Sequence, residues 1–222
     1  MRTNKYLIIS DIHLGDNDCK ADILLKVLKK YKAKTIIIAG DLFDHHNLNR
    51  LKGNHWKVLS KLRKLSKKQK VIYLIGNHCF LKAEFMSILL GFDCKDEYVL
   101  ELKDQKILVV HGDIFDIYFT KYKWITNLVV KIYYIFRHYT PFSDNFFKLF
   151  RNHTNSFAEK SSDMKRNALK YIQNNNYDKV ICGHSHTSEY SDKYINTGSF
   201  CEKVASFVII DNKDKIHLIK YD

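Results

Sequence analysis

Three observations in the sequence predict a layered α/β protein. Short apolar runs, many of them β-branched, recur along the chain with the length of strands. Helical patterns separate the first three runs, so the order is strand, helix, strand, helix, strand. The later runs follow one another closely, which favours a mixed or antiparallel second sheet. The runs cover residues 6–9, 35–39, 71–75, 107–110, 179–182, 205–210 and 215–219.

Three segments carry the pattern of amphipathic helices. Residues 21–32 place apolar side chains on one face and lysines on the other. Residues 56–65 repeat this pattern between the second and third runs. Residues 156–173 supply a crossover helix before the run at 179–182.

The composition limits the class of protein. A chain of 222 residues suits one domain, or one domain with an inserted cap. The formal net charge of +13 favours anionic partners such as nucleotides, nucleic acid or an anionic lipid surface. A coding bias toward lysine would raise the charge equally well, and both explanations stay open.

Cysteine usage and hydropathy point to a cytoplasmic protein. The five cysteines form no C-x-x-C pair, which argues against a disulfide framework or a structural zinc site. No apolar run reaches the roughly 18 residues of a membrane span. The N-terminal apolar run is too short for a signal peptide. Peripheral contact with the inner membrane is an alternative that the basic charge allows.

Five short polar motifs each follow one of the predicted strands. In an open α/β sheet, the loops beyond the carboxyl ends of the strands gather into one crevice. We therefore expect motifs that are far apart in the sequence to converge. They are Asp11-Ile12-His13, Gly40-Asp41-Leu42-Phe43-Asp44, Gly76-Asn77-His78, His111-Gly112-Asp113 and Gly183-His184-Ser185-His186.

The side chains of these motifs suit divalent metals, since carboxylate, imidazole and amide groups bind Mn, Fe and Zn. Asp11 and His13 lie two positions apart, so both can turn toward one ion from a loop. Asp41 is a natural bridging carboxylate. A single histidine at a strand end is usually structural, but five motifs in this order favour a metal centre. The glycines that permit tight turns and close backbone approach are Gly40, Gly76, Gly112 and Gly183.

The motifs resemble those of the calcineurin-like metallophosphoesterases, whose pattern is D-x-H, G-D-x-x-D, G-N-H-[DE], H and G-H-x-H. The match spans nearly the whole chain. It implies a four-layer β-sandwich of two mixed sheets flanked by helices. It also implies two divalent metal ions, with Mn²⁺ expected and Fe or Zn as alternatives. One ion would take Asp11, His13, Asp41 and His186, and the other Asp41, Asn77, His111 and His184.

The resemblance further implies hydrolysis of a phosphate ester or anhydride, in which paired metal ions polarise the phosphoryl oxygens and activate water. His78, oriented by Asp44, would protonate the leaving oxygen or stabilise charge in the transition state. Asn77, His78 and His184 are the expected substrate contacts. The chain departs from the family at Cys79, where relatives carry an acidic residue.

An aromatic and basic segment at about residues 118–151 does not fit the alternation of strands and helices. We expect it to form a helical cap over the site, within a single domain of residues 1–222. Core packing of two extra helices accounts for part of its apolar stripe. The remaining face leaves room for a groove that binds an apolar substrate.

A finer resemblance is to the UDP-2,3-diacylglucosamine diphosphatase group, which cleaves a diacylated nucleotide–sugar pyrophosphate in lipid A biosynthesis. It rests on chain size, the H-G-D motif, the insertion after it and the Asn196-Thr197-Gly198-Ser199 segment. The cap would offer apolar walls to acyl chains and lysines to phosphate or an anionic membrane. The best-known branch has Arg in place of His78, which points to the His-bearing relatives.

Two other functions stay open. A nuclease or cyclic-nucleotide phosphodiesterase with the same metal centre is favoured by the basic residues between 57 and 70. A solvated helix face explains those lysines more simply, so nucleic acid is the less expected partner. A scaffold that has lost catalysis is disfavoured, because every expected ligand and His78 are present.

Overall fold

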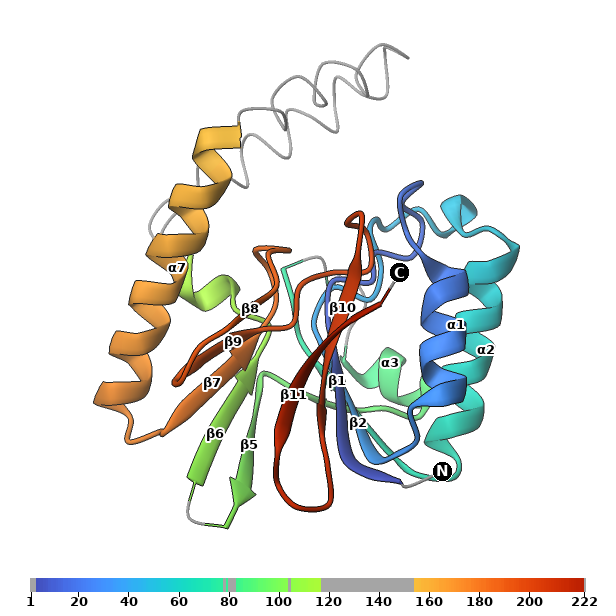
Figure 1. The fold of residues 1–222 in the computed structure, drawn as a ribbon. Helices are drawn as coiled ribbons and strands as arrows, with labels where there is room; N and C mark the ends of the chain where they lie inside the picture. The colour runs from blue at the N-terminus through green and yellow to red at the C-terminus, as the bar shows by residue number, and fades with distance from the viewer. Residues whose placement is uncertain (1–2, 78, 80–82, 104, 117–153, 222) are drawn as a thin grey trace.

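Two mixed β-sheets pack face to face between helices in the computed structural model (Figure 1). The structure describes residues 3–77, 79, 83–103, 105–116 and 154–221, with side chains from 161 onward in the last range. The prediction of an α/β sandwich of two mixed sheets flanked by helices is confirmed. The cap expected at residues 118–151 lies outside the described residues, and so does His78.

The first sheet has six strands in the order β11-β10-β1-β2-β3-β4. Strands β1 to β4 are parallel, and β10 pairs with the other edge of β1 in antiparallel register, with Tyr6 opposite Ile210. The last two predicted strands thus extend the first sheet instead of joining the second, because β1 offers them an open edge. The strands are β1 (Asn4–Ile9), β2 (Ala33–Ala39), β3 (Lys70–Leu74), β4 (Asp93–Lys95), β10 (Ala205–Ile210) and β11 (Ile216–Tyr221).

The second sheet has five strands in the order β5-β6-β7-β9-β8. Strands β6, β7 and β9 are parallel, while β5 and β8 are antiparallel edges. Sequence patterns missed three of these strands, two of which have only two or three residues. The strands are β5 (Glu97–Leu102), β6 (Gln105–Val110), β7 (Lys179–Cys182), β8 (Glu189–Tyr190) and β9 (Tyr194–Asn196).

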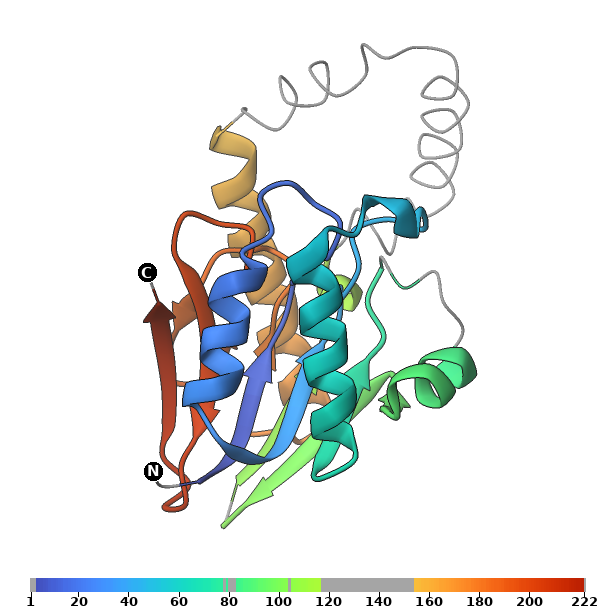
Figure 2. The same ribbon diagram turned by 90° about the vertical axis from the view of Figure 1, so that its right-hand side faces the viewer.

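Helices cover the outer face of each sheet. Helices α1 and α2 lie side by side across the six-stranded sheet (Figure 2). Helix α7 covers the five-stranded sheet on the opposite side of the molecule (Figure 1). The helices are α1 (Ala21–Lys30), α2 (Gly53–Ser66), α3 (Ala83–Leu90) and α7 (Thr154–Asn174), with 3-10 turns η1 (Leu48–Arg50) and η2 (Asp113–Phe115).

Strand alternation explains why the apolar runs are continuous. In β1, Leu7 and Ile9 pack toward the helices, whereas Ile8 packs into the core between the sheets. In β6, Ile107 and Val109 enter the same central core. A strand covered on both faces needs apolar residues at every position, as buried parallel strands do. The result is a fixed spacing between two sheets that both carry polar motifs at their strand ends.

Candidate metal centre

Both sheets contribute side chains to one cluster at their strand ends. The six-stranded sheet supplies all the carboxylate and amide groups together with one imidazole, and the five-stranded sheet supplies three imidazoles. Asp11 and His13 follow β1, Asp41 follows β2, Asn77 follows β3, His111 follows β6, and His184 and His186 follow β7.

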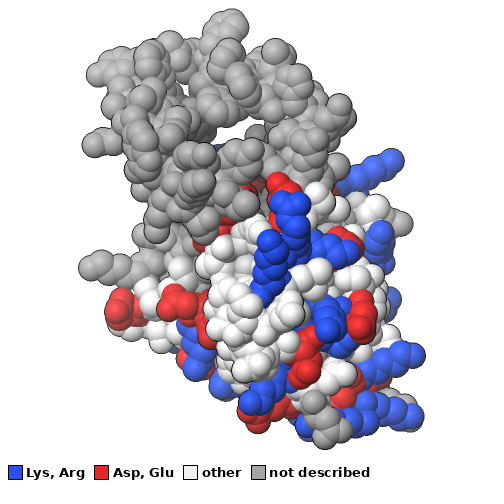
Figure 3. All heavy atoms as spheres, turned by 90° about the vertical axis from the view of Figure 1, so that its left-hand side faces the viewer, with Lys and Arg blue, Asp and Glu red and all other residues white. Residues whose placement is uncertain are grey.

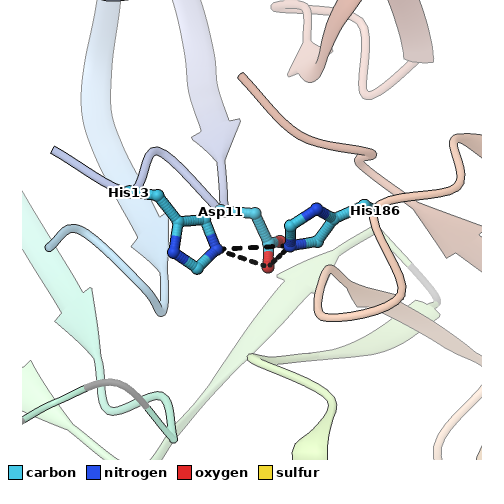
Figure 4. Close-up of side chains that lie close together, drawn as sticks. All are labelled: Asp11, His13 and His186. Atoms are coloured by element: carbon cyan, nitrogen blue, oxygen red, sulfur yellow. Dashed lines mark hydrogen bonds and ion pairs between the residues drawn. The ribbon is translucent and has the colours of Figure 1, made fainter. Parts of the chain in front are cut away.

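Asp11, His13 and His186 form one group of converging atoms (Figure 4). Nε2 of His13 lies 3.2 Å from Nε2 of His186. Oδ1 of Asp11 lies 3.3 Å from Nε2 of His186 and 3.9 Å from Nε2 of His13. Atoms that each bind one ion at about 2.0–2.2 Å lie roughly 3 Å from one another. The spacing of this group therefore suits a single metal ion.

Asn77, His111 and His184 form a second group. Oδ1 of Asn77 lies 2.8 Å from Nε2 of His111 and 3.1 Å from Nδ1 of His184. The two imidazole nitrogens are 3.3 Å apart. Oδ2 of Asp41 faces both groups, at 3.3 Å from Nε2 of His111 and 3.8 Å from Nε2 of His13. The Asp41 carboxylate therefore lies between the two groups.

Burial makes the charges in this cluster interact strongly. Oδ2 of Asp11 accepts a hydrogen bond of 2.9 Å from the backbone N–H of His184. Burial raises the pKa of the Asp11 carboxyl, but the imidazoles of His13, His186 and His111 more than offset this, and the pKa ends well below its usual range. Burial lowers the pKa of His111, while Asp41 and Asp11 raise it to a net value of about 10.

The cluster fits divalent metal ions on its own geometry. Oδ1 of Asp11 is buried, makes no hydrogen bond of standard geometry within the described residues, and faces two imidazole nitrogens. Asp11, Asp41 and His111 also bring three donor atoms within 4.8 Å of one another. Oxygen and imidazole donors of this kind suit Mn, Fe or Zn. A divalent cation would offset the negative charge of the buried Asp11 and Asp41 side chains.

Comparison with known families agrees with this chemistry. The sequence model of the calcineurin-like phosphoesterases matches residues 5–188. The chain belongs to the calcineurin-like phosphoesterase family. The prediction of a metal-dependent phosphoesterase is thereby confirmed at the level of the family, whose members use divalent metals.

The chain is similar to several characterised proteins. It is 30% identical over 130 residues to a UDP-2,3-diacylglucosamine hydrolase of Aliivibrio fischeri. The match spans about half the length of each protein, 53% of this chain and 51% of the relative. A phosphoesterase from E. coli, Yfce, aligns over 98% of this chain with 18% identity and a TM-score of 0.50. Zn²⁺-bound Vps29 from Entamoeba histolytica aligns over 98% of this chain with 14% identity and a TM-score of 0.50. Each of these two solved chains is covered to 99%, and the likeness shows a shared fold.

The backbone at the phosphoesterase motifs is unusual. Asp11, His13, Asp41, His184 and His186 all have left-handed φ angles, between 46° and 69°. Non-glycine residues adopt this region rarely and at some cost, and such residues cluster at functional sites. The strain shows that the fold holds these side chains in orientations that the local chain alone would not favour.

Two motif glycines make room for the carboxylates. A Cβ atom at Gly76 would lie 2.3 Å from Oδ1 of Asp41, and a Cβ atom at Gly183 would lie 2.2 Å from Oδ2 of Asp11. Both distances are far below van der Waals contact. Because glycine has no side chain, the Asp41 carboxylate can lie against the backbone at Gly76, and the Asp11 carboxylate against the backbone at Gly183. Close approach to the backbone is what the sequence predicted for these glycines.

Asp44 has partners that the sequence did not reveal. Its Oδ1 lies 3.8 Å from Nδ1 of His13, and its Oδ2 lies 2.7 Å from Nη1 of Arg50. The expected partner, His78, lies outside the described residues, so the His78–Asp44 pair stays a prediction. Cys79 is partly buried and packs against the core beneath the helices, and its backbone N–H donates to the carbonyl of Gly76 at 3.1 Å.

Sequence reasoning also missed two acidic residues that touch the predicted ligands. Asp116 lies just after η2, with Oδ2 at 3.3 Å from Nε2 of His184. Glu202 lies between β9 and β10, with Oε1 at 3.7 Å from Nδ1 of His186. Both sit in irregular loops outside the five motifs, where no periodicity or spacing distinguishes them from solvated acids.

Proposed function

We propose that this phosphoesterase hydrolyses a phosphodiester or pyrophosphate bond with two divalent metal ions, with Mn²⁺ as the expected metal and Fe or Zn as alternatives. The observation that carries the proposal is the donor spacing of 2.8–3.9 Å in two groups that both face Asp41. Bound ions would act as Lewis acids on the phosphoryl oxygens and would lower the pKa of a water molecule.

In this proposal the residues have separate roles. Asp11, His13, Asp41 and His186 hold one ion, and Asp41, Asn77, His111 and His184 hold the other. Asn77 and His184 also face the substrate. His78, oriented by Asp44, protonates the leaving oxygen or stabilises charge that develops in the transition state.

The substrate that we propose is a nucleotide–sugar lipid pyrophosphate of the UDP-2,3-diacylglucosamine type, as in lipid A biosynthesis. The similarity to the Aliivibrio fischeri hydrolase supports it, over 130 aligned residues. A formal net charge of +13 suits a substrate with a pyrophosphate, and suits contact with an anionic membrane that carries it. Within the described residues, no helix has the length and apolar character to cross a bilayer. A cytoplasmic protein in peripheral contact with the membrane completes the proposal.

A comparison of two substrates tests the proposal. The full chain with Mn²⁺ would be given UDP-2,3-diacylglucosamine, with release of UMP measured, and separately bis-p-nitrophenyl phosphate. We expect rapid release of UMP that is lost on chelation with EDTA and restored by Mn²⁺. UDP-glucose serves as a matched pyrophosphate without acyl chains, and we expect it to be a poor substrate.

Each outcome has a distinct meaning. Cleavage of the generic diester alone would reject the lipid substrate and retain the metal-dependent hydrolase. Equal turnover of the acylated and unacylated pyrophosphates would reject recognition of acyl chains. No turnover of any substrate by protein that has bound metal would reject the hydrolytic activity itself.

A second candidate, a nuclease or cyclic-nucleotide phosphodiesterase, is favoured by one surface feature. Burial lowers the pKa of Lys61, and so do nearby lysines at 29, 32, 64 and 68, which lie on α1, on α2 and in the loops that follow these two helices. Within the described residues, no carboxylate forms an ion pair with these five side chains. On the face shown in Figure 3, by contrast, basic and acidic side chains are interspersed. Turnover of a polynucleotide that falls steeply with added salt would support this candidate.

A further inference from the structure

Each histidine of the candidate centre has one ring nitrogen toward the other ligands and the second toward an acceptor outside. The inward nitrogen is Nε2 for three of them and Nδ1 for His184. The outward contacts are His13 Nδ1 to Asp44 Oδ1 at 3.8 Å, His111 Nδ1 to the carbonyl of Ala39 at 3.0 Å, His184 Nε2 to Asp116 Oδ2 at 3.3 Å, and His186 Nδ1 to Glu202 Oε1 at 3.7 Å.

This pattern has a chemical consequence for metal binding. A neutral imidazole carries a proton on one nitrogen and a lone pair on the other, and only the lone pair can bind a metal. An acceptor on the outer side holds the proton there and leaves the inner lone pair available. Carboxylate acceptors also raise the basicity of the ligating nitrogen and fix the orientation of the ring.

Asp116 is well placed for this role. Its side chain is only 16% exposed and belongs to the chain just after β6 and η2, whereas His184 follows β7. The neighbouring strands β6 and β7 thus bring the acid and the imidazole together. His184 is also the histidine that presents Nδ1 inward, so its ring needs a partner on Nε2 to exclude the other tautomer.

Glu202 is placed for the same role on His186, but less firmly. Its side chain is 57% exposed and its oxygen lies 3.7 Å from Nδ1. Water competes with an exposed carboxylate, so its hold on the ring is weaker than that of a buried one.

We propose that Asp116 and Glu202 are positioning residues, which fix the tautomer and orientation of His184 and His186 so that both rings bind metal. The inference rests on the proposed two-metal function and adds two residues to it. Asp116 acts on the ion held by Asn77, His111 and His184, and Glu202 acts on the ion held by Asp11, His13 and His186. The contribution of Asp116 is the larger of the two.

Metal binding measured without turnover tests the proposal. The full-length wild type, Asp116→Ala, Asp116→Asn and Glu202→Ala would be titrated with Mn²⁺ by equilibrium dialysis, with free Mn²⁺ counted by electron paramagnetic resonance. We expect Asp116→Ala to lower the affinity for one of the two Mn²⁺ ions by about 10–100-fold and to leave the affinity for the other unchanged. Asp116→Asn keeps an acceptor oxygen and should fall between Asp116→Ala and wild type. Glu202→Ala should lower the affinity for the ion held by Asp11, His13 and His186 by less than tenfold.

Glu101→Ala is the control, because Glu101 is an exposed carboxylate on β5, outside the five motifs, and forms no ion pair with a histidine in the described part of the chain. It should bind both ions as wild type does. Asp116→Ala that binds both ions like Glu101→Ala, or that weakens the binding of both ions equally, would overturn the role of Asp116. If Asp116→Ala does not fold, Asp116→Asn decides the question. Wild-type affinity of Asp116→Asn for both ions would then overturn the role of Asp116. Wild-type protein that binds no Mn²⁺ would instead reject the proposed function.

Discussion

Asp41 is the residue on which the two ligand groups depend, since its Oδ2 faces His13 on one side and His111 on the other. Its backbone carbonyl also accepts hydrogen bonds of 3.0 Å from the N–H groups of Ile12 and His13. The D-x-H and G-D-x-x-D motifs are therefore joined through the main chain as well as through their side chains. The sequence predicted that the Asp41 side chain serves both ligand groups, but the main-chain link between the two motifs required the structure.

His78 has a proposed role that separates catalysis from metal binding. We expect His78→Ala to lower turnover of bis-p-nitrophenyl phosphate by about 10²–10⁴-fold, the usual contribution of a general acid. Metal content should stay at the wild-type value, because His78 is not among the proposed ligands. Asp41→Ala is the contrasting variant and should lose both metal and turnover. Near-normal turnover by His78→Ala would show that the role assigned to His78 is wrong.

The raised pKa of His111 predicts that the folding stability of the metal-free protein depends on pH. Its pKa is raised from 6.5 to about 10 in the folded state, so its protonated form stabilises the fold. This stability is fully present below pH 6.5 and is lost as the pH rises through about 10. Urea midpoints of EDTA-treated protein should therefore fall across this window.

The variant His111→Gln isolates the effect of this residue. It should show a smaller fall in urea midpoint over the same window, because it lacks the group that titrates. Identical pH profiles for the variant and the wild type would contradict the assignment. Because metal ions and protons compete for Nε2, Mn²⁺ affinity of the wild type should rise with pH over the same range.

At the scale of single elements, the turns after the strands show what sequence patterns can and cannot predict. The positions of the five motifs followed from apolar runs that end in polar residues. The left-handed backbone of Asp11, His13 and Asp41 did not follow, because even Asp and His, which adopt this region more often than most side chains, do so only rarely. Hydrogen bonds between loops of different strands stabilise it, and those depend on tertiary structure.

The turn after β7 offers a direct test of close packing. Gly183→Ala would place a Cβ atom 2.2 Å from Oδ2 of Asp11 and 2.2 Å from Oγ of Ser10, both of which are buried. We expect a loss of about 1–3 kcal/mol in the free energy of unfolding, typical of overpacking. Mn²⁺ affinity should also fall, because Asp11 must move.

Gly53→Ala is the control for this substitution. Gly53 begins α2, and a Cβ atom there would meet nothing within 4 Å. Its stability should be unchanged, or higher by up to about 1 kcal/mol, since alanine favours helix over glycine. Chemical denaturation of both variants, with and without Mn²⁺, measures the difference. Equal stabilities for the two variants would argue against a close contact at Gly183.

Sequence patterns predicted the strands and helices in which the pattern is long, and they missed most of those in which it is short. Seven apolar runs became strands and three amphipathic segments became helices. Strands β4, β8 and β9 have two or three residues, too few for a period of two to be visible. Strand β5 (Glu97–Leu102) was missed because polar and apolar residues mix at this sheet edge. Pairing with neighbours, not intrinsic preference, makes these segments extended.

At the scale of the molecule, candidate ligands from the strand ends of both sheets gather in one cluster. Metal binding should therefore stabilise the whole fold and not a single loop. We expect Mn²⁺ to raise the melting temperature of EDTA-treated protein, with a gain of about 2.7 kcal/mol per ion when free Mn²⁺ is 100 times the dissociation constant. Thermal unfolding followed by circular dichroism checks this.

The triple variant with His111, His184 and His186 replaced by glutamine is the control for this measurement. It removes every ligand from the five-stranded sheet and should show almost no shift with Mn²⁺. An equal shift in the triple variant would mean that the ions bind elsewhere on the chain. The sequence predicted that the motifs converge, but their division between two sheets required the structure, which places β1, β2 and β3 in one sheet and β6 and β7 in the other.

The sandwich core has a consequence for the choice of metal. All three imidazoles from the five-stranded sheet face candidate ligands from the six-stranded sheet, and the two sheets are held apart by a shared apolar core that includes Ile8, Ile37 and Ile181. We expect a methylene added to or removed from that core to shift the candidate ligands of one sheet relative to those of the other. Ions with different preferred bond lengths would respond in opposite directions. We therefore expect the choice of metal ion to depend on the apolar packing between the sheets as well as on the ligands themselves.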